Sequence, residues 1–472
     1  MFPFSFPGSS LLLLPLIFLP HPQEGGGLAA GGMRSLFDGK SLEGWTDRGG
    51  RYDGEARWSV EDGAIVGRQG EGRRGGLLYT VESFESFDFS CECRTEAPFD
   101  SGIFLNMVPG ARGLQVTLDD RPGGEIAGIY SDGWLRHNPS GKKAWKAGAW
   151  NRIEIRRTGL RPHLRVRING VLVLDWVQEG KLEGFAREGR IGLQVHPGRI
   201  GRPEAAVRFR KLKIRELPTV DEDLFLVDGK GFLVPTAEAE RLGWRPLFDG
   251  KSLSGFEAVP GGSGEKVKGY RVEGGLLLFP KEGPGGYLRT VEDFEDFELL
   301  LEFRTAFMAN SGVFLRAARD GSNPAFSGCE IQILDDFNWE RVTKSRLKPW
   351  QFTGSLYGSV PPGDRGALRP LGRWNLFRIR FRGSRLRTEL NGRLLYDVDT
   401  LRVPGKPFAE RAKRGFLGLQ RHAPREVRDE IYAAFRNLWV RPLKRAEVRG
   451  KGDRGREGGE EGSGAERRKG GE

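Results

Sequence analysis

Residues 375–398, NLFRIRFRGSRLRTELNGRLLYDV, decide the fold of the chain. Arginines recur every second or third residue among apolar ones, which is typical of the solvent side of a half-buried strand. Asn391 and Gly392 stand between two such runs, and Asn-Gly is the strongest short signal for a β-hairpin. The stretch therefore predicts antiparallel strands of a sheet with one buried face.

The same signals recur along the chain. Short apolar or alternating runs bounded by turn residues include DFELLLEFR, SGVFLRA, CEIQILD and GFLGLQRH, and INGVL (168–172) contains a second Asn-Gly. Glycine is frequent, with 70 of 472 residues, and long helical periodicity is hard to find. This spacing predicts an all-β chain built as jelly-roll β-sandwiches.

The chain repeats itself. LFDGKSLEGW at 36–45 returns as LFDGKSLSGF at 247–256, and TVESFESFDF at 80 returns as TVEDFEDFEL at 290, in the same order. Such a long period indicates two tandem copies of one domain and not a solenoid. We expect a first domain at 33–217, a linker at 218–244 and a second domain at 245–443. Within the linker, PTAEAERLG has helix start and stop signals.

Both ends differ in composition from the domains. SSLLLLPLIFLP near the start gives an apolar core too short to cross a bilayer, so we expect residues 1–32 to be a signal peptide and short leader. Residues 444–472 are rich in Gly, Arg and Glu and predict a disordered charged tail. We expect an exported protein (periplasmic, cell-surface or secreted) with no transmembrane helix in its mature chain.

Charge and simple motifs exclude several functions. The formal charge of +12, from 75 Lys and Arg against 63 Asp and Glu, is spread over strands. It accompanies no nucleic-acid-binding module, so we expect no nucleic-acid partner. GEGRRG (70–75) fits a dinucleotide template but precedes a strand where a helix is needed. Cys91, Cys93 and Cys329 offer neither a disulfide framework nor a metal pair, and we expect buried thiols.

Polar residues gather on one side of the second copy's strands. In CEIQILD, alternation sends Glu330 and Gln332 to the face opposite the core. GFLGLQRH likewise places Gln420 and His422 on one face, and NSGVFLR offers Asn310 and Arg316. On one concave sheet these side chains would form a polar cleft that binds a sugar and supplies a base. Alternation alone equally fits ordinary polar residues that face water.

The second copy's phrases, in order, carry a family resemblance. LFDGKSLSGF, DFELLLEFR, NSGVFLRA, CEIQILD, TGSLYG, GRWNLFRIRF, LNGRLLYD and GFLGLQRH resemble the 3-keto-disaccharide hydrolase family. Those are concanavalin A-like jelly rolls, also described as 3-keto-glucoside 1,2-lyase/hydratases. The resemblance covers all of the second copy and most of the first.

The resemblance implies an enzyme that cleaves 3-keto-glycosides. A ketone at C3 acidifies the C2 proton, a general base removes it, the C1 substituent leaves, and hydration completes a net hydrolysis. The implied catalytic residues are Glu330 and His422, with base, acid and metal-ligand roles open between them. The implied substrate-binding residues are Gln332, Asn310, Arg316, Tyr357 and Gln420.

The resemblance leaves room for one cofactor. A divalent metal ion that polarises the C3 ketone would stabilise the enolate. No cluster of metal ligands in the sequence specifies such an ion. The sequence therefore identifies no cofactor with certainty, and a divalent metal ion stays open. The aglycone, the preferred anomer and the oligomeric state stay open.

The two copies differ at the proposed site. Aligning them on their shared Leu-Asp-Asp places Leu114 opposite Glu330 and Val116 opposite Gln332, while Asn310 and Arg316 become Asp100 and Asn106. His196 and Tyr130 are retained. Without a carboxylate the elimination stalls, since a general base is worth about 10²- to 10⁴-fold. We therefore expect a degenerate first domain and a catalytic second domain.

The alternative is a protein without chemistry. Jelly rolls of this type host many lectins, and fold does not dictate function. The chain would then be a tandem carbohydrate-binding or surface-adhesion protein. Such a protein is expected to expose Trp or Tyr on the concave face of both copies.

Overall fold

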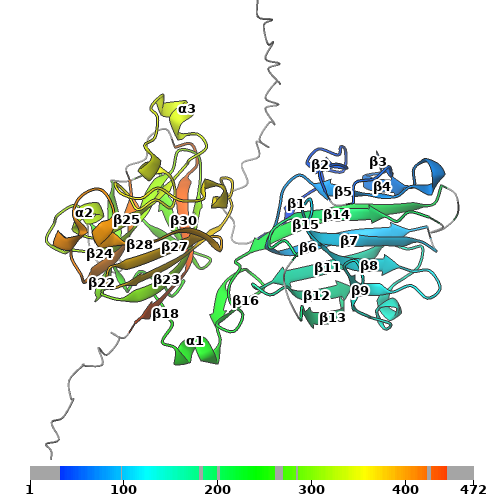
Figure 1. The fold of residues 1–472 in the computed structure, drawn as a ribbon, viewed down its shortest axis with the longest axis horizontal. Coiled ribbons are helices and arrows are strands. Elements are labelled where there is room, and N and C mark those ends of the chain that lie inside the picture. Colours follow the sequence, from blue (N-terminus) through cyan, green and yellow to red (C-terminus); the bar gives the residue numbers. More distant parts are fainter. Residues whose placement is uncertain are drawn as a thin grey trace, which may run out of the picture.

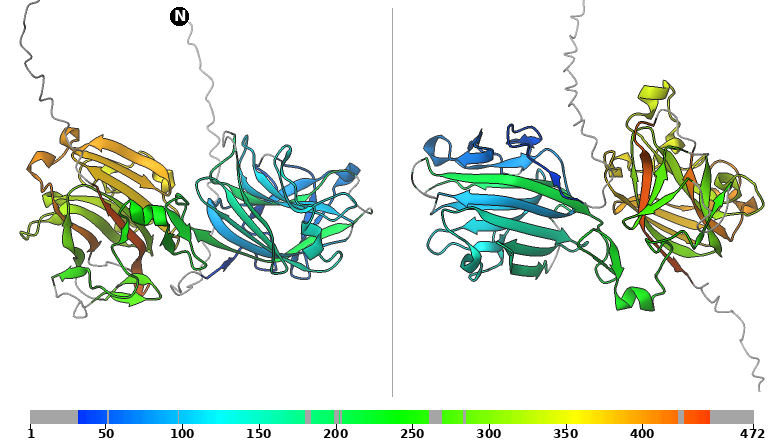
Figure 2. Two further views of the ribbon diagram at one scale, coloured as in Figure 1. Left: turned by 90° about the horizontal axis from the view of Figure 1, so that it is seen from below. Right: turned by 180° about the vertical axis from the view of Figure 1, so that it is seen from behind.

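The computed structural model describes residues 32–443, except 51, 97, 180–183, 199–201, 203, 261–268, 283–284 and 423–426. They form two β-sandwiches that lie side by side and are joined by a connecting segment (Figures 1 and 2). The expected tail, and all but the last residue of the expected leader, lie outside the described residues. Within the described part of the chain, every helix is too short or too polar to cross a membrane.

The first domain consists of two antiparallel sheets. From edge to edge, the eight-stranded sheet contains β13 (Val171–Val177), β12 (His163–Ile168), β11 (Asn151–Thr158), β6 (Ser86–Thr95), β15 (Ala206–Leu217), β4 (Ala64–Arg68) and β3 (Arg57–Glu61), and β1 (Arg34–Ser35) pairs with β15. The seven-stranded sheet contains β10 (Trp134–Arg136), β9 (Ile126–Tyr130), β8 (Leu114–Asp119), β7 (Asp100–Met107), β14 (Arg190–Val195), β5 (Gly76–Thr80) and β2 (Trp45–Thr46). We call the outer side of the seven-stranded sheet the first-domain face.

The second domain repeats this plan with fewer strands. Its eight-stranded sheet contains β20 (Arg271–Glu273), β21 (Leu276–Pro280), β30 (Ile431–Pro442), β23 (Phe297–Thr305), β26 (Asn375–Arg382), β27 (Arg385–Leu390) and β28 (Arg393–Asp399), and β18 (Arg245–Pro246) pairs with β30. Its five-stranded sheet contains β19 (Phe256–Val259), β22 (Gly286–Phe294), β29 (Gly415–Arg421), β24 (Asn310–Ala317) and β25 (Cys329–Leu334). We call the outer side of this sheet the second-domain face.

The described helices are short and belong to loops. The α-helices are α1 (Ala237–Arg241), α2 (Pro324–Ser327) and α3 (Trp339–Thr343). The 3-10 turns are η1 (Glu71–Arg73), η2 (Gly141–Ala144), η4 (Pro349–Gln351), η5 (Arg365–Ala367), η6 (Thr400–Arg402) and η7 (Phe408–Glu410). The chain is therefore all-β, with two tandem jelly-roll sandwiches, as the sequence predicts.

Alternation of apolar residues builds each core. Strand β6 buries Phe87, Phe89, Cys91 and Cys93 and leaves the residues between them half-buried. These two thiols and that of Cys329 are buried and free, which confirms the expectation from the sequence. The cores lie between the two sheets of each sandwich, so alternate residues of each strand face outward.

Both Asn-Gly pairs form the hairpins that the sequence predicts. Asn169-Gly170 joins β12 to β13, and Asn391-Gly392 joins β27 to β28. All four residues have positive φ, between 49° and 84°, as a type I′ turn requires. Asparagine and glycine tolerate this conformation better than other residues, so the turns fix the register of both hairpins.

The linker is packed and does not hang free. Strands β16 (Phe225–Val227) and β17 (Leu233–Pro235) form a hairpin, and Thr236 caps α1 by accepting from the Ala239 amide at 3.2 Å. Phe225 lies between Trp244 and Trp439, with ring centroids 5.4 and 5.3 Å away. The apolar side chains of the linker thus pack on the outer side of the second domain's eight-stranded sheet.

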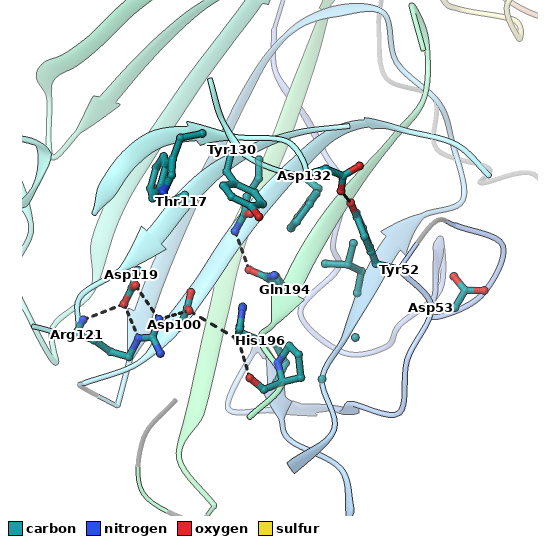
Figure 3. Close-up of a pocket in the computed structure, with 18 residues that line it drawn as sticks. Tyr52, Asp53, Asp100, Thr117, Asp119, Arg121, Tyr130, Asp132, Gln194 and His196 are labelled. Atoms are coloured by element: carbon teal, nitrogen blue, oxygen red, sulfur yellow. Dashed lines mark hydrogen bonds and ion pairs between the residues drawn. The ribbon is translucent and has the colours of Figure 1, made fainter. Parts of the chain in front are cut away.

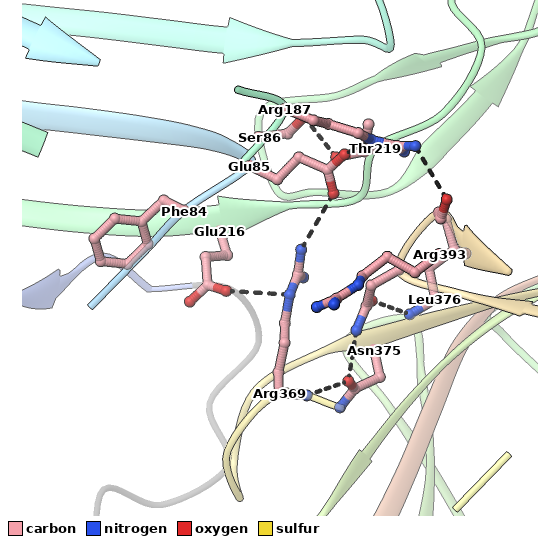
Figure 4. A network of polar contacts seen from close by, with 12 residues as sticks. Phe84, Glu85, Ser86, Arg187, Glu216, Thr219, Arg369, Asn375, Leu376 and Arg393 are labelled. Carbon is pink, nitrogen blue, oxygen red and sulfur yellow. Dashed lines mark hydrogen bonds and ion pairs between the residues drawn. The ribbon is translucent and has the colours of Figure 1, made fainter. Parts of the chain in front are cut away.

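A polar network ties the two domains together (Figure 4). Glu85 and Glu216 of the first domain are buried, with side chains 3% and 9% exposed. The Arg369 guanidinium lies 3.9 Å from the Glu85 carboxylate and 3.6 Å from that of Glu216. Arg373 pairs with Glu216 as well, and burial lowers the pKa of its guanidinium to about 10. At neutral pH Arg373 therefore stays charged, and both arginines pair with a carboxylate of the other domain.

Glu216→Gln should loosen this interface. Two arginines would lose their shared carboxylate, and removing one member of a buried ion pair typically costs about 3 kcal/mol or more. We expect faster hydrogen exchange at residues 84–87 and 369–376 with both sandwiches intact. Glu204→Gln is the control, because Glu204 and its partner Arg57 are largely exposed and such pairs contribute at most about 1 kcal/mol. Equal exchange in the two variants would contradict this assignment.

Candidate functional site

The structure brings four of the predicted polar residues together on the second-domain face. Gly312 of β24 is the cross-strand partner of Gln332 on β25 and of Gln420 on β29. Asn310 lies two residues earlier on β24, so it shares their face. Glu330 lies two residues before Gln332 and points to the same side. Alternation on these three adjacent strands therefore places them as the sequence predicts.

The Glu330 side chain lies over the backbone of the central strand. A Cβ atom at Gly312 would lie 2.2 Å from Glu330 Oε1 and 2.9 Å from its Cδ, which is too close for any side chain. Only a glycine at this position leaves room for the carboxyl group. The group therefore lies directly above β24, between Gln332 and Gln420.

Gln332 is the nearest polar neighbour of this carboxyl group. Carbonyl oxygen and nitrogen of an amide are told apart by their hydrogen-bond partners. With its nitrogen facing the carboxyl group, Gln332 donates to Glu330 Oε1 and to the Ser311 carbonyl oxygen, both at 3.2 Å. On the other side, the side-chain oxygen of Gln420 is buried without a protein partner among the described residues. That amide has hydrogen-bonding capacity left for a ligand.

Burial sets the protonation of Glu330. The residue is 3% exposed, and desolvation raises the pKa of its carboxyl group from 4.5 to about 8. A low-dielectric environment disfavours the charged form of an acid. At pH 7 the group is therefore mostly neutral, and it exchanges a proton in the range where acid–base catalysts are most effective.

Aromatic residues border the carboxyl group on one side. Phe314, the cross-strand partner of Glu330, packs with Phe416, Tyr287 and Tyr357. The Tyr357 backbone N–H donates to the Glu330 carbonyl oxygen at 2.9 Å, which holds its loop against β25. Tyr357 is thus next to Glu330, and together with Tyr287 it adds two phenol groups to this aromatic wall.

His422 lies on the same face at some distance from Glu330. Its neighbour Arg421 pairs with Ser311, so His422 stands level with Asn310, whereas Glu330 stands level with Phe314. At about 3.3 Å per residue and 4.8 Å per strand, the two Cα atoms are roughly 16 Å apart. The imidazole is exposed. The two groups can border one sugar unit, and they are too far apart to share a proton.

Arg316 does not reach this face, contrary to the sequence prediction. Its φ of 52° and a shift in register after Phe314 mark a β-bulge, which reverses the expected alternation. The guanidinium instead donates to the Gly383 carbonyl at 2.7 Å, pairs with Asp296 at 3.0 Å and stacks on Phe381 at 3.5 Å. Arg316 is a buried anchor between the two sheets.

The residues of this face do not fit a divalent cation. Among the described residues, no three His, Cys, Asp or Glu side chains are grouped as metal ligands. Around the site the face offers the Glu330 carboxyl group and the His422 imidazole, separated as given above, while its carboxylates Glu257 and Asp293 are paired with Arg289 and Arg319. Metal sites take several such ligands at about 2.0–2.6 Å. We therefore derive no step through a metal.

Strand pairing in the first domain shows that the sequence alignment of the two copies is wrong by one residue at this strand. Leu105 pairs with Leu114, as Leu315 pairs with Cys329, so Leu114 corresponds to Cys329 and not to Glu330. Gln115 then takes the place of Glu330. Likewise Thr117, not Val116, takes the place of Gln332. Aligning on Leu-Asp-Asp slips the register by one residue, and such a slip exchanges the two faces of a strand.

The polar groups of the first domain line a pocket of about 640 Å³ (Figure 3). Gln115 donates to the Gln194 side-chain oxygen at 2.9 Å. Asp100 pairs with Arg121 and lies 3.8 Å from His196 Nδ1. The remaining lining residues that carry polar or aromatic side chains are Tyr52, Asp53, Phe104, Thr117, Asp119, Tyr130, Asp132 and Trp134.

Sequence reasoning missed this pocket because of that slip. Correct alternation from Gln115 places Thr117 and Asp119 on the same face, and Arg121 follows Asp119 in the chain. The signal was present in LQVTLDDR, but only the pairing with β7 fixes which residues face outward. Trp134 lies on β10, a strand that the sequence analysis did not single out.

Glu330→Gln should stabilise the second domain in a pH-dependent manner. The folded pKa of about 8 lies above the unfolded value of 4.5, so the wild type loses stability as pH rises from 4.5 to 8. At pH 8 the free energy of unfolding of the variant should exceed that of the wild type by about 4 kcal/mol, with no difference at pH 4. Urea unfolding at both pH values measures this. A variant that is equally stable or less stable at pH 8 contradicts the buried, desolvated carboxyl group.

Comparison with known proteins connects this site to a family. A family model described as the 3-keto-alpha-glucoside-1,2-lyase-like domain matches the chain twice, at residues 32–215 and 243–441. A 3-keto-disaccharide hydrolase of Bacteroides thetaiotaomicron is 29% identical over 194 residues, which are 37% of this chain and 60% of that protein. The match thus spans less than two thirds of that relative's length.

Two solved structures from Parabacteroides distasonis ATCC 8503 also align with the chain, and both are provisionally named glycosyl hydrolases. The first is 23% identical, covers 45% of this chain and 99% of its own, and has a TM-score of 0.38. The second is 28% identical, covers 42% of this chain and 99% of its own, and has a TM-score of 0.35. Since the family model matches both domains, the chain belongs to the 3-keto-alpha-glucoside-1,2-lyase-like domain family, of which it carries two copies in tandem.

Proposed function

We propose that the second domain cleaves glycosides that carry a ketone at C3, with Glu330 as the acid–base group. The observation that carries this proposal is a buried carboxyl group with a pKa of about 8, held between two glutamines on the outer face of a family domain. Membership of the family supports a carbohydrate-active enzyme. The specific reaction is our inference from the chemistry of these groups.

The reaction begins with removal of the C2 proton. The C3 ketone acidifies that proton, and the Glu330 carboxylate accepts it. As the enolate collapses to the ketone, a C1–C2 double bond forms and the C1–O bond breaks, and the departing oxygen takes a proton from the water that supplies the C1 hydroxyl, so the aglycone leaves as an alcohol. Water then adds across the double bond, with hydrogen to C2 and hydroxyl to C1. Protonated Glu330 is suited to return the hydrogen, so the sum of the two steps is a hydrolysis.

An amide on this face can donate a hydrogen bond to the oxygen of the C3 ketone. An amide nitrogen donates hydrogen bonds that strengthen as the ketone becomes an enolate, which is the differential stabilisation that lowers a barrier. Asn310 carries such a donor on the same face. Both N–H groups of Gln332 already donate to Glu330 and to Ser311, and among the described residues Gln420 offers an unpaired acceptor oxygen that suits a sugar hydroxyl. Tyr357 and its aromatic neighbours exclude water on one side. His422 lies about one sugar unit away, where it would contact the aglycone or its oxygen.

The cellular location stays a proposal as well. The apolar segment near the start predicts export, and a glycoside-cleaving enzyme outside the cytoplasm would meet its substrates there. Residues 1–31, which would carry the signal, lie outside the described residues.

Glu330→Gln should abolish turnover by the full chain. With the 3-keto derivative of methyl α-D-glucopyranoside, loss of the base should lower kcat by about 10²- to 10⁴-fold. The assay follows consumption of the keto sugar. A fully active variant would show that Glu330 is not the base. A wild-type chain that binds the keto sugar without consuming it would favour the carbohydrate-binding alternative.

The pH profile tests the protonation state of Glu330. A base with a pKa of about 8 is mostly protonated at pH 6, so kcat should rise about tenfold per pH unit up to pH 8 and then level off. Steady-state rates between pH 6 and 9.5 measure this. A rate that falls over this range would make Glu330 the proton donor in the slow step.

Gly312→Ala should displace the carboxyl group and leave the fold intact. The new Cβ collides with the end of a flexible side chain, which can rotate away at little cost to stability. We expect at least a tenfold loss of turnover, since small misplacements of catalytic groups are costly. Gly102→Ala is the matched control, because it displaces Gln115 in the first domain in the same way. Equal losses in the two variants would contradict the assignment of turnover to the second domain.

A further inference from the structure

We propose that the pocket of the first domain is a second saccharide site, which binds a fully hydroxylated glycoside and does not cleave it. Binding at this pocket is independent of the reaction assigned to the second domain, whereas the lack of cleavage rests on that proposed function. It rests on the size of the pocket, on its exposed aromatic side chains and on the kind of hydrogen-bonding groups that line it (Figure 3).

Aromatic side chains stand exposed where this pocket opens. Tyr130 and Trp134 are 36% and 45% exposed, and their ring centroids lie 5.7 Å apart. The Trp134 ring also stacks on His137 at 4.4 Å, which holds its indole in place. Large aromatic surfaces left in water beside a pocket mark a binding site. Their flat faces suit the apolar C–H side of a pyranose ring.

The polar lining is dominated by hydrogen-bond acceptors. Four aspartates line the pocket, namely Asp53, Asp100, Asp119 and Asp132. An ionised carboxylate only accepts hydrogen bonds, and each has about four lone-pair positions. A sugar hydroxyl can donate to such a group, whereas a ketone oxygen cannot. The lining therefore favours a glycoside whose hydroxyls are all present over its 3-keto form.

A cluster of charged groups orients the ligand at one end of the pocket. Asp100 is buried between Arg121 and His196, and desolvation raises the pKa of its carboxyl group. Arg121 is also held by Asp119, with Nε to Oδ1 at 2.9 Å. The partly exposed His196 adds a ring nitrogen that can contact a hydroxyl. Such a fixed set of donors and acceptors binds pairs of neighbouring hydroxyls.

The same face lacks the group that the second domain would use for proton removal. Gln115 occupies the position of Glu330, and its amide has no proton to exchange at neutral pH. The Asp100 carboxylate stands level with Asp119, four residues along β7 from the level of Gln115. A sugar bound in the same pose on both faces would therefore have Glu330 near one of its ends in the second domain and Asp100 near its other end in the first domain.

Binding of methyl α-D-glucopyranoside to the full-length chain tests the proposal. Isothermal titration with the glycoside should give one site. The 3-keto derivative, titrated into the Glu330→Gln chain so that it is not consumed, should bind the second domain and compete only weakly for the glycoside site. Trp134→Ala and Asp100→Asn should each weaken binding of the glycoside at least tenfold. Glu330→Gln should leave it unchanged. Val171→Ala, which shortens an exposed apolar side chain of the edge strand β13, is the control for surface changes.

The possible results separate this proposal from the one above. No binding at millimolar glycoside, or equal binding in the Trp134→Ala and Val171→Ala chains, would overturn the site. Consumption of the keto sugar that survives in Glu330→Gln and disappears in Asp100→Asn would overturn its non-catalytic character. Failure of turnover in the wild type would contradict the second-domain reaction alone, because the titration measures only binding. Circular dichroism of each variant confirms that its fold is retained.

Discussion

The second-domain face depends on the absence of a side chain at Gly312. The carboxyl group of Glu330 occupies the space that a Cβ atom would take, so it lies over the central strand instead of extending into water. This placement causes its burial, and burial raises its pKa. Gly102 does the same in the first domain, where a Cβ would lie 2.4 Å from the Gln115 nitrogen. Both copies thus have a glycine in the central strand. The space above it holds the acid Glu330 in the second domain and the neutral amide Gln115 in the first.

Sequence patterns predict the parts of this structure that depend on local alternation. Strands, hairpins and the shared face of Glu330, Gln332 and Gln420 follow from a period of two and from turn residues. Arg316 was misplaced because a β-bulge breaks that period, and nothing in NSGVFLR announces a positive φ at this position. The alignment of Gln115 failed for a related reason, since register belongs to a pair of strands and not to one of them. Local patterns therefore predict a face but not its irregularities.

The stability of the second domain opposes its proposed chemistry. A hydrophobic residue in place of Glu330 would remove an acid whose ionisation disfavours the folded state above pH 4.5. The Gln332 amide moderates this conflict, because its nitrogen can donate to the ionised form and its oxygen can accept from the neutral form. A group that must change protonation during a reaction needs a neighbour that serves both states. Gln115 does not have to change its protonation, and among the described residues its side-chain nitrogen donates to the Gln194 side-chain oxygen.

The two proposed sites also differ in the hydrogen-bonding groups that they offer to a sugar. Amides dominate around Glu330, and an amide can donate to a ketone or to the enolate that forms from it. The pocket beside Gln115 is lined by four carboxylates, with Asp100 and Asp119 at the end away from Gln115, and among the groups of a sugar only hydroxyls can donate to them. A site built to bind a hydroxyl discriminates strongly against an analogue that lacks it, since the acceptor is then left buried and unpaired. One duplicated fold can therefore select opposite oxidation states of the same sugar by exchanging acceptors for donors, while its strands and its core stay the same.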